Sequence, residues 1–250
     1  MVLPGPARLS VEALTWLLAG EGIGELHRVL APAAVWQPAD EVDAVRVAAR
    51  AEITALGWFD RRQRLDVEVA ASLAVLCRAT TEFYGWINHD EATIGVLAGA
   101  IGGQALLAVR DTDRMWLKPT AWPRLAAALV GQTAEVPAGR GQPVTVTQAE
   151  ILGAVRGQRL TEAAVQVTRA SGAAQWVRRL VALPTTGSGE LYAAVRDGMG
   201  RHRISAPIPY ADTSEGRYVT VRTGAQVLVV PANRANLVAR LTEAHRTLAR

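Results

Sequence analysis

The chain has few of the residue types that form disulfides and metal centres. Among its 250 residues it has one cysteine, Cys77, and four histidines. A single cysteine excludes an internal disulfide and a cysteine-rich zinc cluster, and no histidine has a zinc-like spacing to another ligand. The sequence therefore predicts neither a metal nor a cofactor.

Lysine is equally scarce, since Lys118 is the only one. The 27 basic residues are therefore nearly all arginine, and against 23 acidic residues they leave a net charge of +4. Most of the arginines are dispersed, whereas nucleic-acid-binding domains usually gather them on one dense basic face. A basic α+β nucleic-acid-binding module is thus the alternative interpretation, and nucleic acid is not the expected partner.

Long apolar segments are also missing. The longest uncharged run, Ile94–Val109, is shorter than the roughly 20 residues of a membrane-spanning helix, and glycines interrupt it. The first ten residues lack the charged and then apolar pattern of a signal peptide. We therefore expect no membrane span and a cytoplasmic location, and we interpret the run as two strands joined at Gly102-Gly103.

No catalytic signature stands out. Asp212-Thr213-Ser214 is similar to the active-site turn of aspartic proteases, which need two such carboxylates. The equivalent region of the first half, 99–103, has none. His202 and Asp212 are the nearest candidate pair for an unrecognised site. We expect a protein that is not an enzyme, with a β-turn at Asp212–Gly216 and a strand at Tyr218–Arg222.

A weak internal repeat organises the chain. Residues 112 positions apart match as follows: Val109-Arg110 with Val221-Arg222, Pro119 with Pro231, Leu125 with Leu237, and Leu129 with Leu241. We therefore expect the segments 104–130 and 216–242 to share one path of strand, turn, strand and helix. Each proline suits the first turn of a helix, where its missing N–H has no partner to lose.

The rest of the pattern completes two similar halves. Helical periodicity predicts helices at Asp40–Leu56 and Asp66–Ala79, and at about 161–170 and 173–183. The sequence predicts an α+β fold in which two pseudo-symmetric ααββββα-like halves, about 1–131 and 144–250, share one central antiparallel sheet. The Gly/Pro-rich segment 132–143 is expected to be the loop that joins them within a single domain, 1–250.

Several stretches resemble one known family. They are "GSGELYAAVRDGMGRHRISAPIPYADTSEGRYVTVR" (187–222), "VLVVPANRANLVARL" (227–241), "GGQALLAVRDTDRMWLKPTAWPRLAAALV" (102–130) and "GIGELHRVL" (22–30). In this order they resemble the EspG family of ESX (type VII) secretion-associated proteins of actinobacteria. His27 stands where that family often has proline, and residues 132–170 match poorly.

The resemblance implies a fold and a function. Proteins of the EspG family have a central antiparallel sheet with two helical bundles in a quasi-twofold arrangement. They are cytosolic chaperones that bind PE–PPE heterodimers, cover an apolar tip of the PPE protein and deliver the pair to its secretion system. The family's contacts come mainly from the sheet and the C-terminal bundle. The expected partner is thus a PE/PPE-type heterodimer, and a homodimer is left open.

Side-chain alternation selects the candidate contacts. Val219 and Val221 should face a helical layer, which leaves Tyr218 and its alternating neighbours on the opposite face of the sheet. Tyrosine and arginine are enriched at binding hot spots, and the strand at 201–203 also has one basic side. The predicted partner-binding residues are Arg201, His202, Arg203, Tyr218, Thr220 and Arg222. The predicted core residues are Trp116, Leu117, Val219, Val221, Leu228, Leu237 and Leu241.

Overall fold

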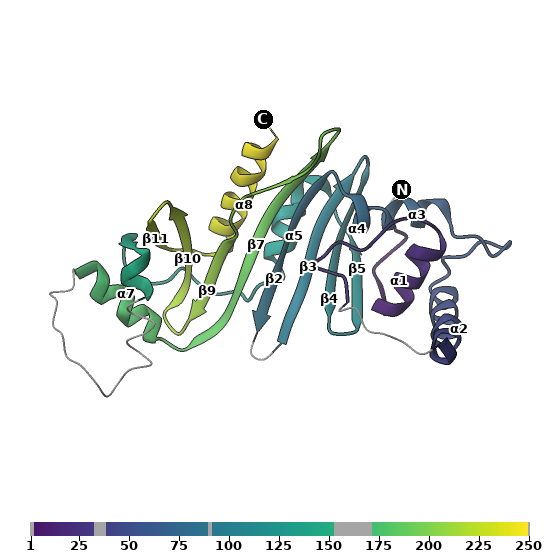
Figure 1. The fold of residues 1–250 in the computed structure, drawn as a ribbon, viewed down its shortest axis with the longest axis horizontal. Coiled ribbons are helices and arrows are strands. Elements are labelled where there is room, and N and C mark those ends of the chain that lie inside the picture. The colour runs from purple at the N-terminus through teal and green to yellow at the C-terminus, as the bar shows by residue number, and fades with distance from the viewer. Residues whose placement is uncertain (1–2, 33–38, 90–91, 153–171, 250) are drawn as a thin grey trace.

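One long antiparallel sheet forms the frame of the protein (Figure 1). The structure, a computed structural model, describes residues 3–32, 39–89, 92–152 and 172–249. Within these residues eleven strands join the sheet, ten of them in the order β1-β5-β4-β3-β2-β7-β9-β10-β11-β6, while β8 pairs with β7 off this path. The predicted α+β fold with a central antiparallel sheet is confirmed.

The strands of the first half are consecutive hairpins. They are β2 (Thr81–His89), β3 (Ala92–Ile101), β4 (Gln104–Asp111) and β5 (Arg114–Pro119), and β1 (Ala7–Ser10) pairs with β5 at the edge. Gly102 takes the positive φ of 55° in the turn between β3 and β4. The predicted hairpin at Gly102-Gly103 is therefore confirmed, and β1 is a strand that the sequence did not predict.

The strands of the second half run outward from the pairing of β2 with β7. They are β7 (Thr185–Asp197), β8 (Gly200–Arg203), β9 (Ile208–Thr213), β10 (Gly216–Thr223) and β11 (Gln226–Pro231), with β6 (Val144–Thr147) at the edge. Strands β10 and β11 have the lengths of β4 and β5, 112 positions later. The shared order of elements is thus confirmed, whereas the superposition of the two halves stays a prediction.

The two prolines of the repeat lie elsewhere than expected. Pro119 and Pro231 are the last residues of β5 and β11 rather than the first of a helix. A strand end tolerates proline because the ladder needs no further N–H donor there. The helices begin a few residues later, as η1 (Trp122–Arg124) with α5 (Leu125–Val130), and as α8 (Arg234–Leu248).

The helices of the first half are α1 (Val11–Gly20), α2 (Ala39–Ala55), α3 (Val67–Leu73) and α4 (Val75–Arg78). Ser10 caps α1 by accepting a hydrogen bond from the Ala13 N–H. The Ser10 hydroxyl in turn donates to Glu52 of α2 at 2.6 Å, which ties the two helices together. Both predicted helices of this half are confirmed, the second being divided at Ala74.

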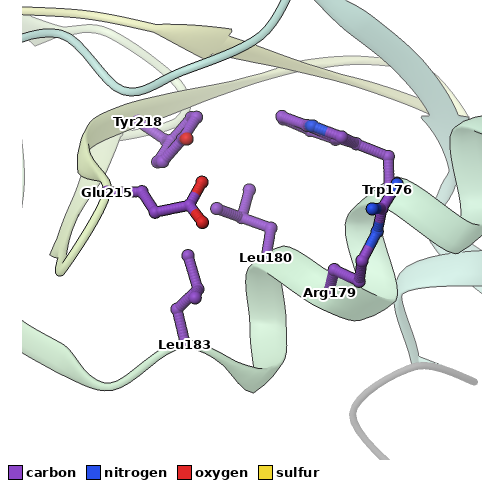
Figure 2. A pocket seen from close by; sticks show the side chains of 6 residues that line it. All are labelled: Trp176, Arg179, Leu180, Leu183, Glu215 and Tyr218. Carbon is purple, nitrogen blue, oxygen red and sulfur yellow. The ribbon is translucent and has the colours of Figure 1, made fainter.

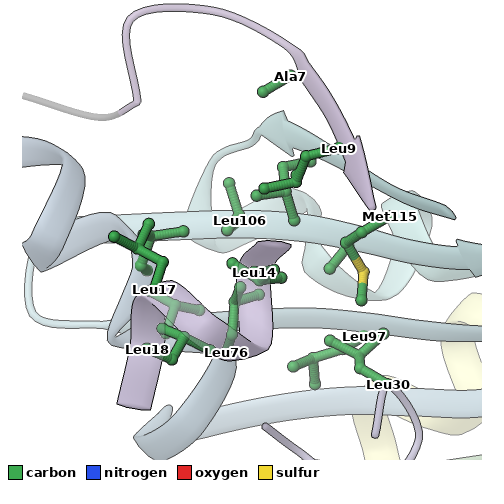
Figure 3. Packing of buried hydrophobic residues seen from close by; sticks show 14 of the residues in the cluster. Ala7, Leu9, Leu14, Leu17, Leu18, Leu30, Leu76, Leu97, Leu106 and Met115 are labelled. Atoms are coloured by element: carbon green, nitrogen blue, oxygen red, sulfur yellow. The ribbon is translucent and has the colours of Figure 1, made fainter. Parts of the chain in front are cut away.

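Helices cover both faces of the sheet. Helices α1, α3 and α4 pack on the face that carries Leu97, Leu106 and Met115, which we call the front face (Figure 3). Helices α5 and α8 pack on the back face against Val96 and Val219. Tyr218 lies next to Val219 in β10, so it points to the front face. There, at the other end of the sheet, α7 (Gly172–Ala182) covers it.

Most of the predicted core is buried. Leu117, Val219, Leu237 and Leu241 are at most 1% exposed, and Val221 and Leu228 are half-buried. The prediction for Trp116 is wrong, because this side chain is 47% exposed. Leu117 points to the front face, so its neighbour must point to the back, where Arg8 stacks on the indole ring at 4.4 Å.

The segment 132–143 has no helix, as predicted, but it is more than a connection. The Gly139 N–H donates to the Arg217 carbonyl at 2.9 Å, and the Arg217 N–H donates to the Pro137 carbonyl at 2.9 Å. Ala138 also forms a parallel bridge with Arg217. The segment is therefore a strap that lies along β10, and the division into two halves around it stays a prediction.

Two expected helices have different outcomes. The helix expected at 173–183 is α7, while the one expected at 161–170 lies outside the described residues. No helix in the described ranges is long and apolar enough to cross a membrane.

Candidate functional site

An ion pair lies beneath the strap. Asp212 of β9 and Arg217 of β10 stand opposite each other in the sheet, and their side chains are 1% and 0% exposed. The Arg217 guanidinium donates to both carboxylate oxygens, at 2.6 and 2.8 Å, and also to the Thr133 hydroxyl and the Ala134 carbonyl of the strap. Asp212, whose turn is similar to the active-site turn of aspartic proteases, therefore has a structural role as the partner of Arg217.

The turn after Asp212 agrees with the prediction. Thr213 ends β9, and its hydroxyl donates to the Gly216 carbonyl at 2.9 Å while accepting from the Glu215 N–H at 3.2 Å. Strand β10 then runs through the expected region. His202 lies 3.4 Å from Asp197, so the two members of the candidate catalytic pair have different partners.

Tyr218 is held inside the fold. It is 3% exposed, and its hydroxyl donates to the Arg140 carbonyl at 2.9 Å. Trp176 of α7 contacts its ring edge-on, with 5.8 Å between the ring centroids. A Cβ on Gly139 would come within 2.2 Å of the tyrosine ring, so the strap needs glycine there. Burial raises the pKa of Tyr218. Tyr218, which was predicted to contact the partner, thus forms part of the floor of a hollow.

This floor belongs to an apolar hollow of about 310 Å³ between α7 and the front face of the second half. Val177, Leu180 and Val181 line it from α7, and Ile151 lines it from the short helical stretch 148–152. The strands contribute Pro209, Ala211, Tyr218, Thr220 and Val229. Such a cavity, mostly apolar with a few hydroxyls, suits the side chains of an apolar ligand.

A smaller hollow of about 120 Å³ adjoins it and shares Leu180 and Tyr218. Figure 2 shows Leu180 pointing from α7 toward Glu215 and Tyr218, with Arg179 and Trp176 farther along the helix. Both Arg179 and Glu215 are exposed. We call the two hollows together the α7 groove. It combines an apolar floor with a charged rim, which is the usual anatomy of a protein interface.

The six predicted contact residues fall into two groups of three, of which the first is accessible on the front face. Thr220 lines the α7 groove. Arg222 follows on the same face and is exposed. Arg203 is also exposed on the front face, and its guanidinium lies 5.9 Å from the centre of the Tyr192 ring. Three of the six side chains are therefore available to a partner on this face.

The other three have different positions. Tyr218 is buried, as described above. Arg201 is part of an ion pair with buried Glu82, at 2.6 Å. His202 alternates with its two arginine neighbours and so points to the back face. Because Arg201 is neutralised in this way, strand β8 presents no continuous basic stripe.

The helical wall of the groove was not predicted from the sequence. Trp176 and Leu180 lie four residues apart on α7, as do Val177 and Val181. This spacing places all four on one side of the helix, so it could have identified the wall. In the described parts of the chain, no group of three or more His, Cys, Asp or Glu side chains could hold a metal ion.

Two of three comparisons with known proteins find a match. A search of curated protein sequences finds no match. The model of the EspG family matches residues 10–243. Among solved structures, the chain is similar to the Mycobacterium tuberculosis type VII secretion system chaperone EspG5, whose structure is a complex with the PE25–PPE41 dimer. The TM-score is 0.68 at 15% identity, over 97% of this chain and 96% of that one. This chain therefore belongs to the EspG family.

Proposed function

We propose that the protein is a cytoplasmic chaperone that binds a PE–PPE-type heterodimer and keeps it competent for type VII secretion. The observation that carries the proposal is the match over nearly the whole chain to EspG5, a chaperone described in complex with such a dimer. Membership of the EspG family supports it as well. The protein acts by binding rather than by catalysis.

The α7 groove is the proposed contact site for an apolar tip of the client. Burying one large aliphatic or aromatic side chain contributes about 1.5–3 kcal/mol, and the larger hollow, of about 310 Å³, has room for such side chains. Thr220 would contact the tip directly, while Arg222 and Arg203 would meet polar groups around it. Arg179 and Glu215 on the rim would then fix its orientation.

Co-expression tests the function. The full chain would be produced with each PE–PPE pair encoded near its gene, and every mixture would be analysed by size-exclusion chromatography. We expect one pair to co-elute with the chain as a stable complex and to stay in solution in its presence. If the chain elutes alone with every pair, and each pair is as soluble without it, the proposed function is wrong.

A second arm distinguishes the alternative interpretation. The isolated chain would be titrated into a fluorescent 20-base-pair DNA of random sequence at low and moderate salt. A chaperone of this kind should show no saturable binding. Saturable binding that weakens steeply as salt rises would instead indicate a nucleic-acid-binding module.

A further inference from the structure

A third hollow lies apart from the α7 groove and shares no residue with it. Its volume is about 490 Å³, and it lies where the loop after α1, the end of α4 and the β7–β8 hairpin meet. Four arginines line it, namely Arg28, Arg78, Arg196 and Arg201. We call this hollow the arginine bowl, and the proposed function makes no use of it.

One arginine of the bowl is already neutralised. The Arg201 Nε donates to the Glu82 carboxylate at 2.8 Å, and His27 Nε2 lies 3.5 Å from the same oxygen. Burial alone would raise the pKa of Glu82, but hydrogen bonds from His27 and Arg201 outweigh it and hold this pKa below its ordinary value. Glu82 is thus ionised and already paired with Arg201. Among the residues that line the bowl, the acidic one is Glu25, which is exposed.

The other three arginines have no acidic partner within the described ranges of the chain. Arg28 lies over the Trp86 ring at 5.1 Å, and Arg78 is exposed at the end of α4. Arg196 is half-buried, and its Nε is enclosed without a hydrogen-bond acceptor among the described residues. A buried donor without an acceptor is unfavourable. The bowl therefore holds excess positive charge and an unused donor.

The backbone fixes these groups in position. Arg196 stands opposite Arg201 in the β7–β8 ladder, so both side chains are on the front face. The Arg196 N–H also donates to the Thr80 carbonyl at 2.9 Å, next to the end of α4. Gly24, with φ of 139°, brings the opposite wall against Cys77, since a Cβ there would lie 3.1 Å from the cysteine Cβ. The arginines thus converge from three separate segments.

We propose that the arginine bowl binds the phosphate group of a small molecule. Guanidinium groups match phosphate oxygens with paired hydrogen bonds, and a phosphate dianion can accept from several arginines at once. A single carboxylate has fewer oxygens and half the charge. Ile23, Leu26 and Cys77 in the same lining offer apolar contacts to the organic part of such a ligand.

Calorimetry on the full chain tests the proposal. Pyrophosphate and ADP would each be titrated in a low-chloride buffer into the native protein and into the variants Arg196→Gln, Arg78→Gln and Arg62→Gln. Arg62 is an exposed arginine outside the bowl and serves as the matched control. We expect saturable 1:1 binding by the native protein, at least tenfold weaker binding by the two bowl variants, and no change in the control.

The two probes separate the source of the phosphate. Equal affinities would indicate that the phosphate alone is recognised, and tighter binding of ADP would add a role for the apolar wall. The proposal is overturned if neither probe saturates at millimolar concentration, or if Arg78→Gln, an exposed position where folding is not at risk, binds as tightly as the native chain. Tighter binding of a tetraglutamate peptide than of either probe would also overturn it.

Discussion

Replacing Arg217 with methionine should destabilise the protein strongly. The variant would leave the Asp212 carboxylate, 1% exposed, without its counter-charge. It would also remove the donors to Thr133 and Ala134, which hold the strap. Breaking a buried ion pair from one side costs about 3–5 kcal/mol. At roughly 2–4 °C per kcal/mol for a chain of this size, we expect the melting temperature to fall by about 10 °C.

Urea unfolding followed by circular dichroism would measure this loss, with the double variant Asp212→Leu/Arg217→Met as the control. Because the double variant removes both charges, it should be more stable than Arg217→Met, by an amount on the order of 2 kcal/mol. A loss below about 1 kcal/mol for Arg217→Met would refute the reasoning. So would a double variant that is less stable than the single one.

Three further outcomes are expected. Gly95→Ala should destabilise the fold, since its Cβ would lie 2.0 Å from the Val29 carbonyl oxygen, whereas Gly103→Ala, in open space, should be tolerated in the same urea assay. The folded-state pKa of Glu82 is lowered, so its stabilising contribution is complete above pH 5 and is lost as pH falls below about 4. The difference in unfolding free energy between the native protein and Glu82→Gln should therefore shrink as the pH is lowered from 5 to below about 4. A difference that stays constant with pH would contradict the lowered pKa of Glu82. Burial raises the pKa of Cys77 to about 11. Its reaction with a thiol reagent at pH 8 should accordingly be much slower than in the urea-unfolded chain, and equal rates would be inconsistent with this.

The hairpins were predictable because their signals are local. Gly102-Gly103 lies between two apolar runs, and turn residues lie between Asp212 and Gly216, so each position indicates a turn without knowledge of the fold. The repeat likewise gave the order of elements in 104–130 and 216–242. Strand β1 escaped prediction because its pattern, although it alternates, spans only four residues and runs directly into α1.

The groove was less predictable because it depends on contacts between distant segments. Alternation correctly placed Tyr218 on the face of the sheet opposite to that of Val219, but nothing in the local sequence indicates that the strap and α7 cover Tyr218. In the same way, the sequence shows the basic side of β8 but not that Glu82, far along the chain, neutralises Arg201. Alternation assigns a side chain to a face, and tertiary packing decides whether that face is open.

Arg110 is not a suitable control for a binding test at Arg222. Arg110 is the repeat-equivalent of Arg222, but its guanidinium donates to the Ala31 and Thr112 carbonyls, and so holds the loop that crosses β3. A charge reversal at Arg110 would therefore disturb folding as well as binding. Alanines on the strands offer a better pair, because Ala211 lies on the groove floor and Ala92 is exposed at the start of β3.

The affinity of the Ala211→Arg variant for a PE–PPE dimer tests the central claim most directly. The new side chain would enter the apolar hollow of about 310 Å³ and place a charge in it, whereas Ala92→Arg adds the same charge to the sheet outside the groove. Calorimetry with the dimer that co-elutes with the native chain should show affinity reduced at least a hundredfold for Ala211→Arg and unchanged for Ala92→Arg, both variants being folded. Native affinity in Ala211→Arg would contradict the claim that the client's apolar tip occupies the α7 groove.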